Sequence, residues 1–282
     1  MNAEIPRPIR PVLSGIPETT LWTLHDRAAE AARPDGILRD PHAIRMRNAL
    51  MIDWMARFGA ADGSFAGRSR AIDILLTDWL GRHPDGMIIS IGEGLETQSR
   101  RVDNGTCTWL SIDLPEVITL RRQMLPDTER FRSLGVDALD TGWLEAVDPS
   151  RPCLFLMQGL LMYFPPDRVA PLLRHMTKRF PASMLIFDTV PVWFATLTAH
   201  GLHKTPLFTV PRMRWGIDRD RIGPTLACWS LSRPLRLLPY GAARGRSWMA
   251  SLALSPQNRL IPSQGRRFPR DRLPVIVTLP PA

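Results

Sequence analysis

Two glycines and one aspartate have a spacing that could hold a nucleoside. Gly92 and Gly94 follow the apolar run 87–91, and Asp113 lies 21 residues beyond Gly92, directly after a second apolar run at 107–112. Glycine lets the backbone approach a ligand where a Cβ would collide. A carboxylate at the end of the neighbouring strand can accept hydrogen bonds from ribose hydroxyls. The pattern therefore predicts a nucleoside-cofactor site.

The same turn argues against a dinucleotide. A dinucleotide site has a third glycine that lets the helix pack over the pyrophosphate, and here that position is Thr97. Glu93 and Glu96 lie where two phosphates would sit, and their charge would repel them. A helix is expected over 95–102, with N–H groups at its start that face a polar ligand. A cofactor without phosphate and with a positive centre, such as S-adenosylmethionine, suits this turn better than NAD.

Five apolar runs are expected to be the strands that position the site, and each is followed by a polar residue or a glycine. The runs are 87–91, 107–112, 132–136, 153–157 and 184–187. The residues that follow them are Gly92, Asp113, Asp137, Gln158 with Gly159, and Asp188. Helical stretches alternate with the runs, which predicts right-handed βαβ units, a parallel sheet and a ligand at the carboxyl ends of its strands.

The chain divides into three segments of one structural domain. Residues 1–85 are expected to form an arm over 1–14 and a helical preface, with helices at 17–32, 41–58 and 68–80. Residues 86–190 form the cofactor-binding α/β core. Residues 191–282, rich in proline and tryptophan, are expected to form a substrate cap and two late strands at 235–238 and 275–279. The fold class is α/β and Rossmann-like.

Composition indicates a globular protein without metal or membrane. Of 282 residues, 44% are hydrophobic and 22% charged, which is typical of a chain with a substantial core. No run of eighteen apolar residues predicts a membrane span, and the first residues lack an apolar signal core. Cys107, Cys153 and Cys228 have no metal spacing and suit reduced thiols, so a cytoplasmic location is expected.

The formal charge of +9 comes almost entirely from arginine, because Lys178 and Lys204 are the only lysines. The arginines are scattered and form no basic helix with interleaved aromatic residues, so nucleic-acid binding is not expected. Attraction of an anionic or aromatic small-molecule substrate is the favoured interpretation. A monomer or a homodimer is expected.

Five segments of the chain carry a family resemblance: 19–43, 91–105, 109–121, 158–164 and 214–218. The motifs GEGLETQ and IDLPEV within them are the most specific. The chain resembles the leucine carboxyl methyltransferase family, and within it the branch of the tetracenomycin polyketide-synthesis carboxyl O-methyltransferase. This resemblance implies S-adenosylmethionine as cofactor, a seven-stranded methyltransferase sheet and methyl transfer to oxygen, often that of a carboxylate.

The resemblance also assigns residues to the cofactor. Arg68, for which Arg70 is a rival, would pair with its carboxylate, and Asp113 would hold the ribose. Gln158 stands where many relatives have glutamate. Asp137, for which Asp140 is an alternative, would help to frame the adenine. The full set of expected cofactor residues is Arg68, Gly92, Gly94, Asp113, Leu114, Asp137, Ala138, Leu139, Gln158 and Gly159.

The expected substrate contacts rest on weaker signals. They are Thr23, His25 and Arg27 on the first helix, Tyr163 after the fourth strand, and Trp193 and Trp215 in the cap. Each has an ordinary structural alternative as a solvated or core side chain. The six histidines form no pair of base and orienting group, so no catalytic residue is assigned.

Methyl transfer from a sulfonium is an in-line displacement, in which the enzyme mainly aligns the reactants. A carboxylate is already ionised near neutral pH, whereas a phenol needs a base. The prediction is an S-adenosylmethionine-dependent O-methyltransferase that favours a carboxylate of a polyketide-like natural product. An NAD-type oxidoreductase and a non-catalytic structural subunit are the alternatives.

Overall fold

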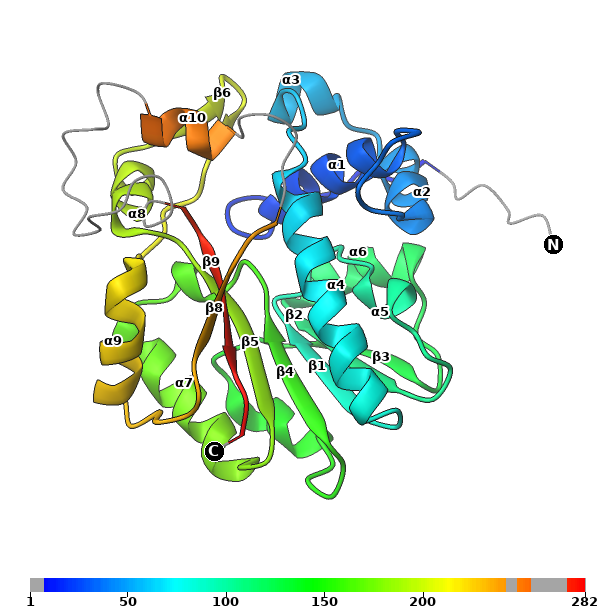
Figure 1. The fold of residues 1–282 in the computed structure, drawn as a ribbon. Helices are drawn as coiled ribbons and strands as arrows, with labels where there is room; N and C mark the ends of the chain where they lie inside the picture. Colours follow the sequence, from blue (N-terminus) through cyan, green and yellow to red (C-terminus); the bar gives the residue numbers. More distant parts are fainter. Residues whose placement is uncertain (1–7, 242–247, 255–272, 282) are drawn as a thin grey trace.

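A computed structural model describes residues 8–241, 248–254 and 273–281. Within this part of the chain seven strands form one sheet, in the order β3-β2-β1-β4-β5-β9-β8 (Figure 1). The strands are β1 (Met87–Ile91), β2 (Thr108–Asp113), β3 (Phe131–Gly135), β4 (Cys153–Met157), β5 (Met184–Thr189), β8 (Arg236–Pro239) and β9 (Val275–Leu279). The first five are parallel, and β9 runs antiparallel to both β5 and β8. The predicted Rossmann-like, mostly parallel seven-stranded sheet is confirmed.

Both faces of the sheet are buried, because alternate residues of each strand point to opposite sides. Ile88 of β1 packs with α4 (Ser64–Arg82), which crosses the sheet in front of β1 and β4 in Figure 1. Ile89 packs on the other face, where α7 (Pro166–Arg179) and α9 (Ile222–Cys228) cover the sheet. The continuous apolar strands of the sequence therefore reflect burial on both sides.

The helical preface lies over the carboxyl ends of the parallel strands (Figure 1). Its helices α1 (Thr19–Ala31), α2 (Pro41–Ala49) and α3 (Trp54–Phe58) lie there, whereas α4, expected as the last helix of the preface, packs on a face of the sheet. The single helix expected over 41–58 is wrong, because the chain is extended at Leu50 and pairs there with the arm. Ile9 N–H donates to Ala49 O at 2.9 Å, and Ile9 O accepts from Met51 N–H at 2.9 Å.

The segment after β5 serves both the cap and the sheet. Helix α8 (Val192–Ala199), the hairpin of β6 (His203–Thr205) and β7 (Phe208–Thr209), and α10 (Trp248–Leu254) lie over the same end of the sheet as the preface. An apolar cluster joins the two parts through residues such as Trp22, Phe58 and Phe208. The remaining described helices are α5 (Gln98–Arg101), α6 (Pro115–Met124) and the 3₁₀ turns η1 (Thr141–Ala146), η2 (Leu161–Tyr163) and η3 (Arg219–Arg221).

The described helices are too short or too polar for a bilayer: none combines the length and the apolar character that a membrane span requires.

Candidate active site

A cavity of about 410 Å³ lies between the carboxyl ends of the strands and helices α1 and α4. It brings together nine of the ten residues that the sequence assigned to a cofactor: Arg68, Gly92, Gly94, Asp113, Leu114, Asp137, Ala138, Gln158 and Gly159. Leu139 does not line it. The Leu139 N–H donates to Asp137 Oδ1 at 2.8 Å, while its side chain packs on the core cluster beneath α7.

The glycine turn, residues 92–97, lies in close contact with α1. Gly92 and Gly94 have φ angles of +65° and +59°, which glycine adopts readily. A Cβ on Gly94 would lie 2.2 Å from Thr20 Oγ1, so only glycine lets α1 approach this closely. Thr20 Oγ1 in turn accepts a hydrogen bond from Leu95 N–H.

The backbone N–H groups of this turn are all occupied. Those of residues 92–97 donate to Ile112 O, Asp113 Oδ2, Thr20 Oγ1, Glu93 O and Glu96 Oε1. The helix expected over 95–102 is wrong in extent, because α5 covers only Gln98–Arg101. No N–H group of residues 92–97 remains to cradle a phosphate, which argues against a dinucleotide.

The acidic residues of the turn are neutralised from within. Glu93 accepts from Arg121 Nη2 at 2.9 Å and from Trp109 Nε1 at 3.0 Å. Glu96 pairs with Arg27 Nη1 at 3.0 Å and with Arg101 Nη1 at 2.9 Å. The predicted repulsion of phosphate by these carboxylates is therefore largely cancelled, and the occupied N–H groups are the stronger argument.

This network includes one of the expected substrate contacts. Arg27 is buried and also pairs with Asp40 Oδ2 at 2.9 Å. Burial opposes ionisation of Glu96, but the positive charges of Arg27 and Arg101 hold its pKa well below the ordinary value. Arg27 thus lies behind the cofactor turn and does not line the cavity.

Three further expected substrate residues also lie outside the cavity. His25 Nε2 hydrogen-bonds Gly59 O at 3.0 Å, and its ring stacks on Trp54 with centroids 5.6 Å apart. Trp193 is fully buried in the apolar cluster of the cap. Trp215 packs against Trp229 at 5.4 Å, in the core on the α7 face. The two tryptophans are held by apolar packing, and His25 is held by stacking and a hydrogen bond. Thr23 and Tyr163, in contrast, line the cavity.

Arg68 occupies the position where the sequence left two candidates. It is buried and donates from Nη1 to Asp188 Oδ2 at 3.0 Å, whereas Arg70 on the same helix is exposed. Asp188 also accepts from Gly159 N–H at 2.6 Å and from the hydroxyl of Tyr240. Arg68 is therefore held in place by β5 and by the residue that follows β8.

Three buried polar atoms of residues that line the cavity have no hydrogen-bond partner among the described residues. They are the donor Arg68 Nε and the acceptors Gln98 Oε1 and Gln158 Oε1. Buried polar atoms are almost always paired, so unpaired ones at the wall of a cavity are positions where a polar ligand could bind. One donor beside two acceptors suits a zwitterionic amino-acid group, whose carboxylate would face the guanidinium and whose ammonium would face the amide oxygens.

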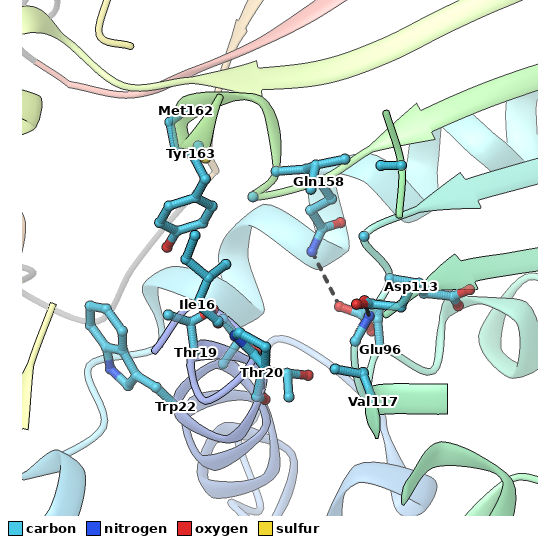
Figure 2. Close-up of a pocket in the computed structure, with 18 of the residues that line it drawn as sticks. Ile16, Thr19, Thr20, Trp22, Glu96, Asp113, Val117, Gln158, Met162 and Tyr163 are labelled. Carbon is cyan, nitrogen blue, oxygen red and sulfur yellow. Dashed lines mark hydrogen bonds between the residues drawn. The ribbon is translucent and has the colours of Figure 1, made fainter. Parts of the chain in front are cut away.

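Figure 2 shows how Gln158 and Glu96 face each other across the polar end of the cavity, close to Asp113. Gln158 Nε2 donates to Glu96 Oε2 at 3.2 Å. This bond leaves the Gln158 oxygen as an acceptor, so the glutamine presents no negative charge of its own.

Asp113 and Asp137 follow neighbouring strands at the edge of the cavity. Asp113 accepts from Gly94 N–H at 2.7 Å and from Leu114 N–H at 2.8 Å, and burial raises its pKa to about 6. Each carboxylate oxygen keeps a lone pair for a further donor. Asp137 is exposed and lines the cavity, whereas its alternative Asp140 accepts from Gly142 N–H at the start of η1.

The other end of the cavity is apolar and aromatic. Figure 2 shows Ile16 and Trp22 from the N-terminal segment opposite Met162 and Tyr163 from η2. Burial raises the pKa of Tyr163 to about 12. No histidine lines the cavity in the part of the chain that is described. The sequence does not identify most of this end, because its residues have no chemical signature that separates them from core residues: Ile16, Trp22, Phe65, Met162, Phe194, Met213 and Met249.

Known proteins resemble the chain both in sequence and in fold. A tetracenomycin polyketide synthesis O-methyltransferase of Streptomyces glaucescens is 29% identical over 216 residues, which cover 74% of this chain and 78% of the relative. An S-adenosyl-L-methionine-dependent methyltransferase of Gibberella zeae, dpfgK, is 32% identical over 186 residues, or 60% of this chain and 62% of the relative.

A solved structure supports the fold alone. The small RNA methyltransferase HEN1 superposes with a TM-score of 0.50 at 10% identity, over 76% of this chain and 25% of that protein. The family model of the leucine carboxyl methyltransferases matches residues 20–177, a range that includes the preface helix α1, the glycine turn, Asp113 and Gln158. This match spans more than half of the sequence and confirms the predicted resemblance. The chain therefore belongs to the leucine carboxyl methyltransferase family.

Proposed function

We propose that the protein transfers a methyl group from S-adenosylmethionine to a carboxylate oxygen of an aromatic small molecule. Family membership carries the coarser statement, that the protein is an S-adenosylmethionine-dependent methyltransferase. The observation that supports the finer one is the division of the cavity. Its polar end holds unpaired buried atoms of Arg68, Gln98 and Gln158, and its other end is apolar and contains no histidine among the described residues.

The polar end fits the cofactor residue by residue. Arg68 would hold the carboxylate of the methionine portion, and the oxygens of Gln98 and Gln158 would accept from its ammonium. Asp113 would accept from the ribose hydroxyls, and Asp137 from the adenine end. The cofactor supplies a methyl group already activated on a sulfonium.

The two glycines and their neighbours complete this assignment. Gly92 and Gly94 would let the methionine portion approach the backbone, Gly159 leaves room for the Arg68 guanidinium, and Leu114 and Ala138 would contact the nucleoside. A Cβ on Gly159 would lie 3.0 Å from Arg68 Nη1. Leu139 keeps a role only through its N–H, which fixes Asp137.

Because no histidine among the described residues lines the cavity, the apolar end suits an acceptor oxygen that needs no base to remove a proton. A phenol must lose its proton, and that requires a base within hydrogen-bond reach. Tyr163 remains a neutral donor at neutral pH, because its pKa is raised to about 12. Thr23 and Tyr163 can orient an acceptor oxygen by hydrogen bonding. Alignment in a site that excludes water can lower the barrier by roughly 7–11 kcal/mol.

The name of the Streptomyces relative adds the substrate class. It is an O-methyltransferase of tetracenomycin polyketide synthesis, and the aromatic walls formed by Trp22, Phe65 and Phe194 suit a flat polycyclic acceptor. The proposed acceptor is therefore a polyketide-like aromatic acid.

The test compares two acceptors on one ring system, the para-carboxylate of biphenyl and para-phenylphenol. Each is incubated with the protein and S-adenosylmethionine, and the products are identified by mass spectrometry. The proposal expects the methyl ester and no methyl ether, and Asp113→Ala should abolish both product formation and calorimetric binding of S-adenosylhomocysteine. Methylation of the phenol alone would refute the carboxylate assignment. Binding of NAD in place of S-adenosylhomocysteine would refute the cofactor assignment.

A further inference from the structure

A second cavity adjoins the first. It has a volume of about 570 Å³ and lies under the cap, between α1, the β6–β7 hairpin and the end of β8. Four residues line both cavities, so they form a common wall: Trp22, Phe65, Tyr240 and Met249. A ligand that passes this wall would be in contact with both spaces.

Lys204 supplies this second cavity with a cation. Its Nζ lies 5.5 Å from the ring centroid of Trp22 and 4.9 Å from that of Trp248. Neither a hydrogen bond nor an ion pair of this ammonium occurs within the described ranges. Burial lowers the pKa of Lys204, as expected for an ammonium that has lost part of its water. An anionic partner is most stabilising for such a group.

The other charged groups around this cavity hydrogen-bond to the backbone. Asp26 accepts hydrogen bonds from the N–H groups of residues 62, 63, 65 and 66. Asp62 accepts from the N–H groups of Ser64 and Trp248. Arg219 donates from Nη2 to Leu237 O at 3.2 Å. Among these groups, the Lys204 ammonium contacts two aromatic rings and makes no hydrogen bond or ion pair within the described ranges. The charges of Asp62 and Asp26 act on it without such a contact and only partly offset the lowering of its pKa by burial.

The first cavity offers no comparable cation to an acceptor. Arg68 is the only basic residue among its described lining, and it is paired with Asp188 and, in the proposed function, with the cofactor carboxylate. A second anionic group on an acceptor could therefore pair with a cation only in the second cavity, where Lys204 lies beyond Trp22 and Phe65.

We propose that the second cavity binds the far end of the acceptor, and that Lys204 pairs there with a second carboxylate, remote from the oxygen that is methylated. The preferred substrate class is therefore an aromatic dicarboxylate whose rings pass the wall between the cavities. This inference rests on the proposed function for the identity of the reaction, but the binding of the second carboxylate is independent of it.

The para-linked mono- and dicarboxylates of biphenyl test this inference. In the wild-type protein the dicarboxylate should have a KM about tenfold below that of the monocarboxylate, as expected for one charge-assisted contact. Lys204→Met should remove this difference by raising the KM of the dicarboxylate alone, with kcat nearly unchanged. Lys204→Arg should retain the preference. The control is Lys178→Met, which changes the only other lysine, an exposed residue of α7.

A parallel readout separates this inference from the proposed reaction. Binding of both probes to the protein saturated with S-adenosylhomocysteine is measured by calorimetry in wild type and Lys204→Met. A dicarboxylate preference that depends on Lys204 supports the second cavity even if neither probe is methylated, in which case only the proposed function fails. Equal affinity for the two probes in wild type, or an equal loss of both in Lys204→Met, overturns the inference even if both probes are methylated.

Discussion

Asp113 is subject to two opposing requirements. Burial raises the pKa of its carboxyl to about 6, whereas ribose hydroxyls need ionised oxygens as acceptors. The hydrogen bonds from Gly94 N–H and Leu114 N–H favour the ionised form but only partly offset the burial. The folded-state pKa lies above that of the unfolded chain, so ionisation of this carboxyl destabilises the unliganded fold. This cost is absent below the unfolded pKa of about 4, grows as the pH rises and is complete above about 6.

Cofactor affinity should therefore fall in acid. Below the pKa of about 6 the protonated carboxyl must lose its proton before it binds, so the association constant of S-adenosylhomocysteine should fall by up to about tenfold per pH unit. Calorimetry between pH 5 and pH 8 (roughly one unit below and two above that pKa) checks this. Asp113→Asn should bind weakly at every pH, and the exposed Asp137→Asn should keep the wild-type profile. A flat wild-type profile would contradict the role of Asp113.

At the same scale, the sequence identifies residues that are polar, or glycine, directly after an apolar run. Gly92, Asp113 and Gln158 follow apolar runs, and this context predicted their common position correctly. Trp22 and His25 could not be sorted in this way. Both lie on α1, and only the packing of the cap decides that the indole lines the cavity while the imidazole stacks on Trp54.

Helix α1 contacts the glycine turn at two places. Thr20 of this helix accepts a hydrogen bond from Leu95 N–H of the glycine turn. Arg27 of the same helix forms ion pairs with Glu96 and Asp40 on the side of the turn away from the cavity. Thus one helix of the preface fixes the cofactor turn from two sides. Arg27 does not line the cavity, so its expected contact with the substrate stays a prediction.

The contact between α1 and the turn is testable by a matched pair of glycine variants. Gly94→Ala and Gly105→Ala both place a side chain at positive φ, but only the first meets an obstacle, Thr20 Oγ1 at 2.2 Å. Gly94→Ala should therefore destabilise the protein by about 1–3 kcal/mol more than Gly105→Ala and weaken S-adenosylhomocysteine binding. Urea denaturation and calorimetry give the two quantities. Equal destabilisation by both variants would show that α1 does not press on the turn.

The ion pairs of Arg27 should dominate the stability of the preface. Arg27→Met leaves the buried Asp40 and Glu96 with fewer positive partners, and the expected cost is about 3–5 kcal/mol. Arg33→Met removes an exposed pair with Asp35 on the same stretch of chain and should change stability by less than about 1 kcal/mol.

Denaturant unfolding compares the two arginine variants. If Arg27 contacts the acceptor instead, Arg27→Met would unfold like the wild type and show only a raised KM for the acceptor. That result would support the role that the sequence suggested.

The elements themselves were predicted well wherever local pattern determines them. The five parallel strands, the preface helices and the late strands β8 and β9 lie within a few residues of their expected places. The exceptions have tertiary causes. Ile9 of the arm interrupts the helix expected over 41–58 by pairing at Leu50, and Leu95 N–H donates to Thr20 Oγ1 of α1 where the sequence predicted the start of a helix. Ile9 and Thr20 are both distant in sequence from the residues that they bind.

At the scale of the molecule, the first cavity, which is the proposed cofactor site, joins parts that are distant in the chain. Its lining comes from α1, α4, the ends of the first four strands, and Tyr240 after β8. A ligand that binds all of these only in the folded state stabilises them together.

S-Adenosylhomocysteine should therefore protect the preface as well as the core. At about 100 times its dissociation constant it should add about 2.7 kcal/mol to the free energy of unfolding, whereas NAD should add nothing. Hydrogen exchange should slow both in the α1 region and in the glycine turn. Protection confined to the turn would mean that α1 is not part of the site, and stabilisation by NAD alone would reverse the cofactor assignment.

The position of β9 has a consequence for synthesis. This strand is the last of the sheet in chain order, yet it lies between β5 and β8 and is entirely buried. Until it has left the ribosome, the nascent chain carries two unpaired strand edges that are flanked by apolar faces, a state prone to pairing with other chains. The sheet can therefore close only after translation has passed residue 279. A chain truncated shortly before this point would contain most residues of the proposed cofactor site but would tend to aggregate.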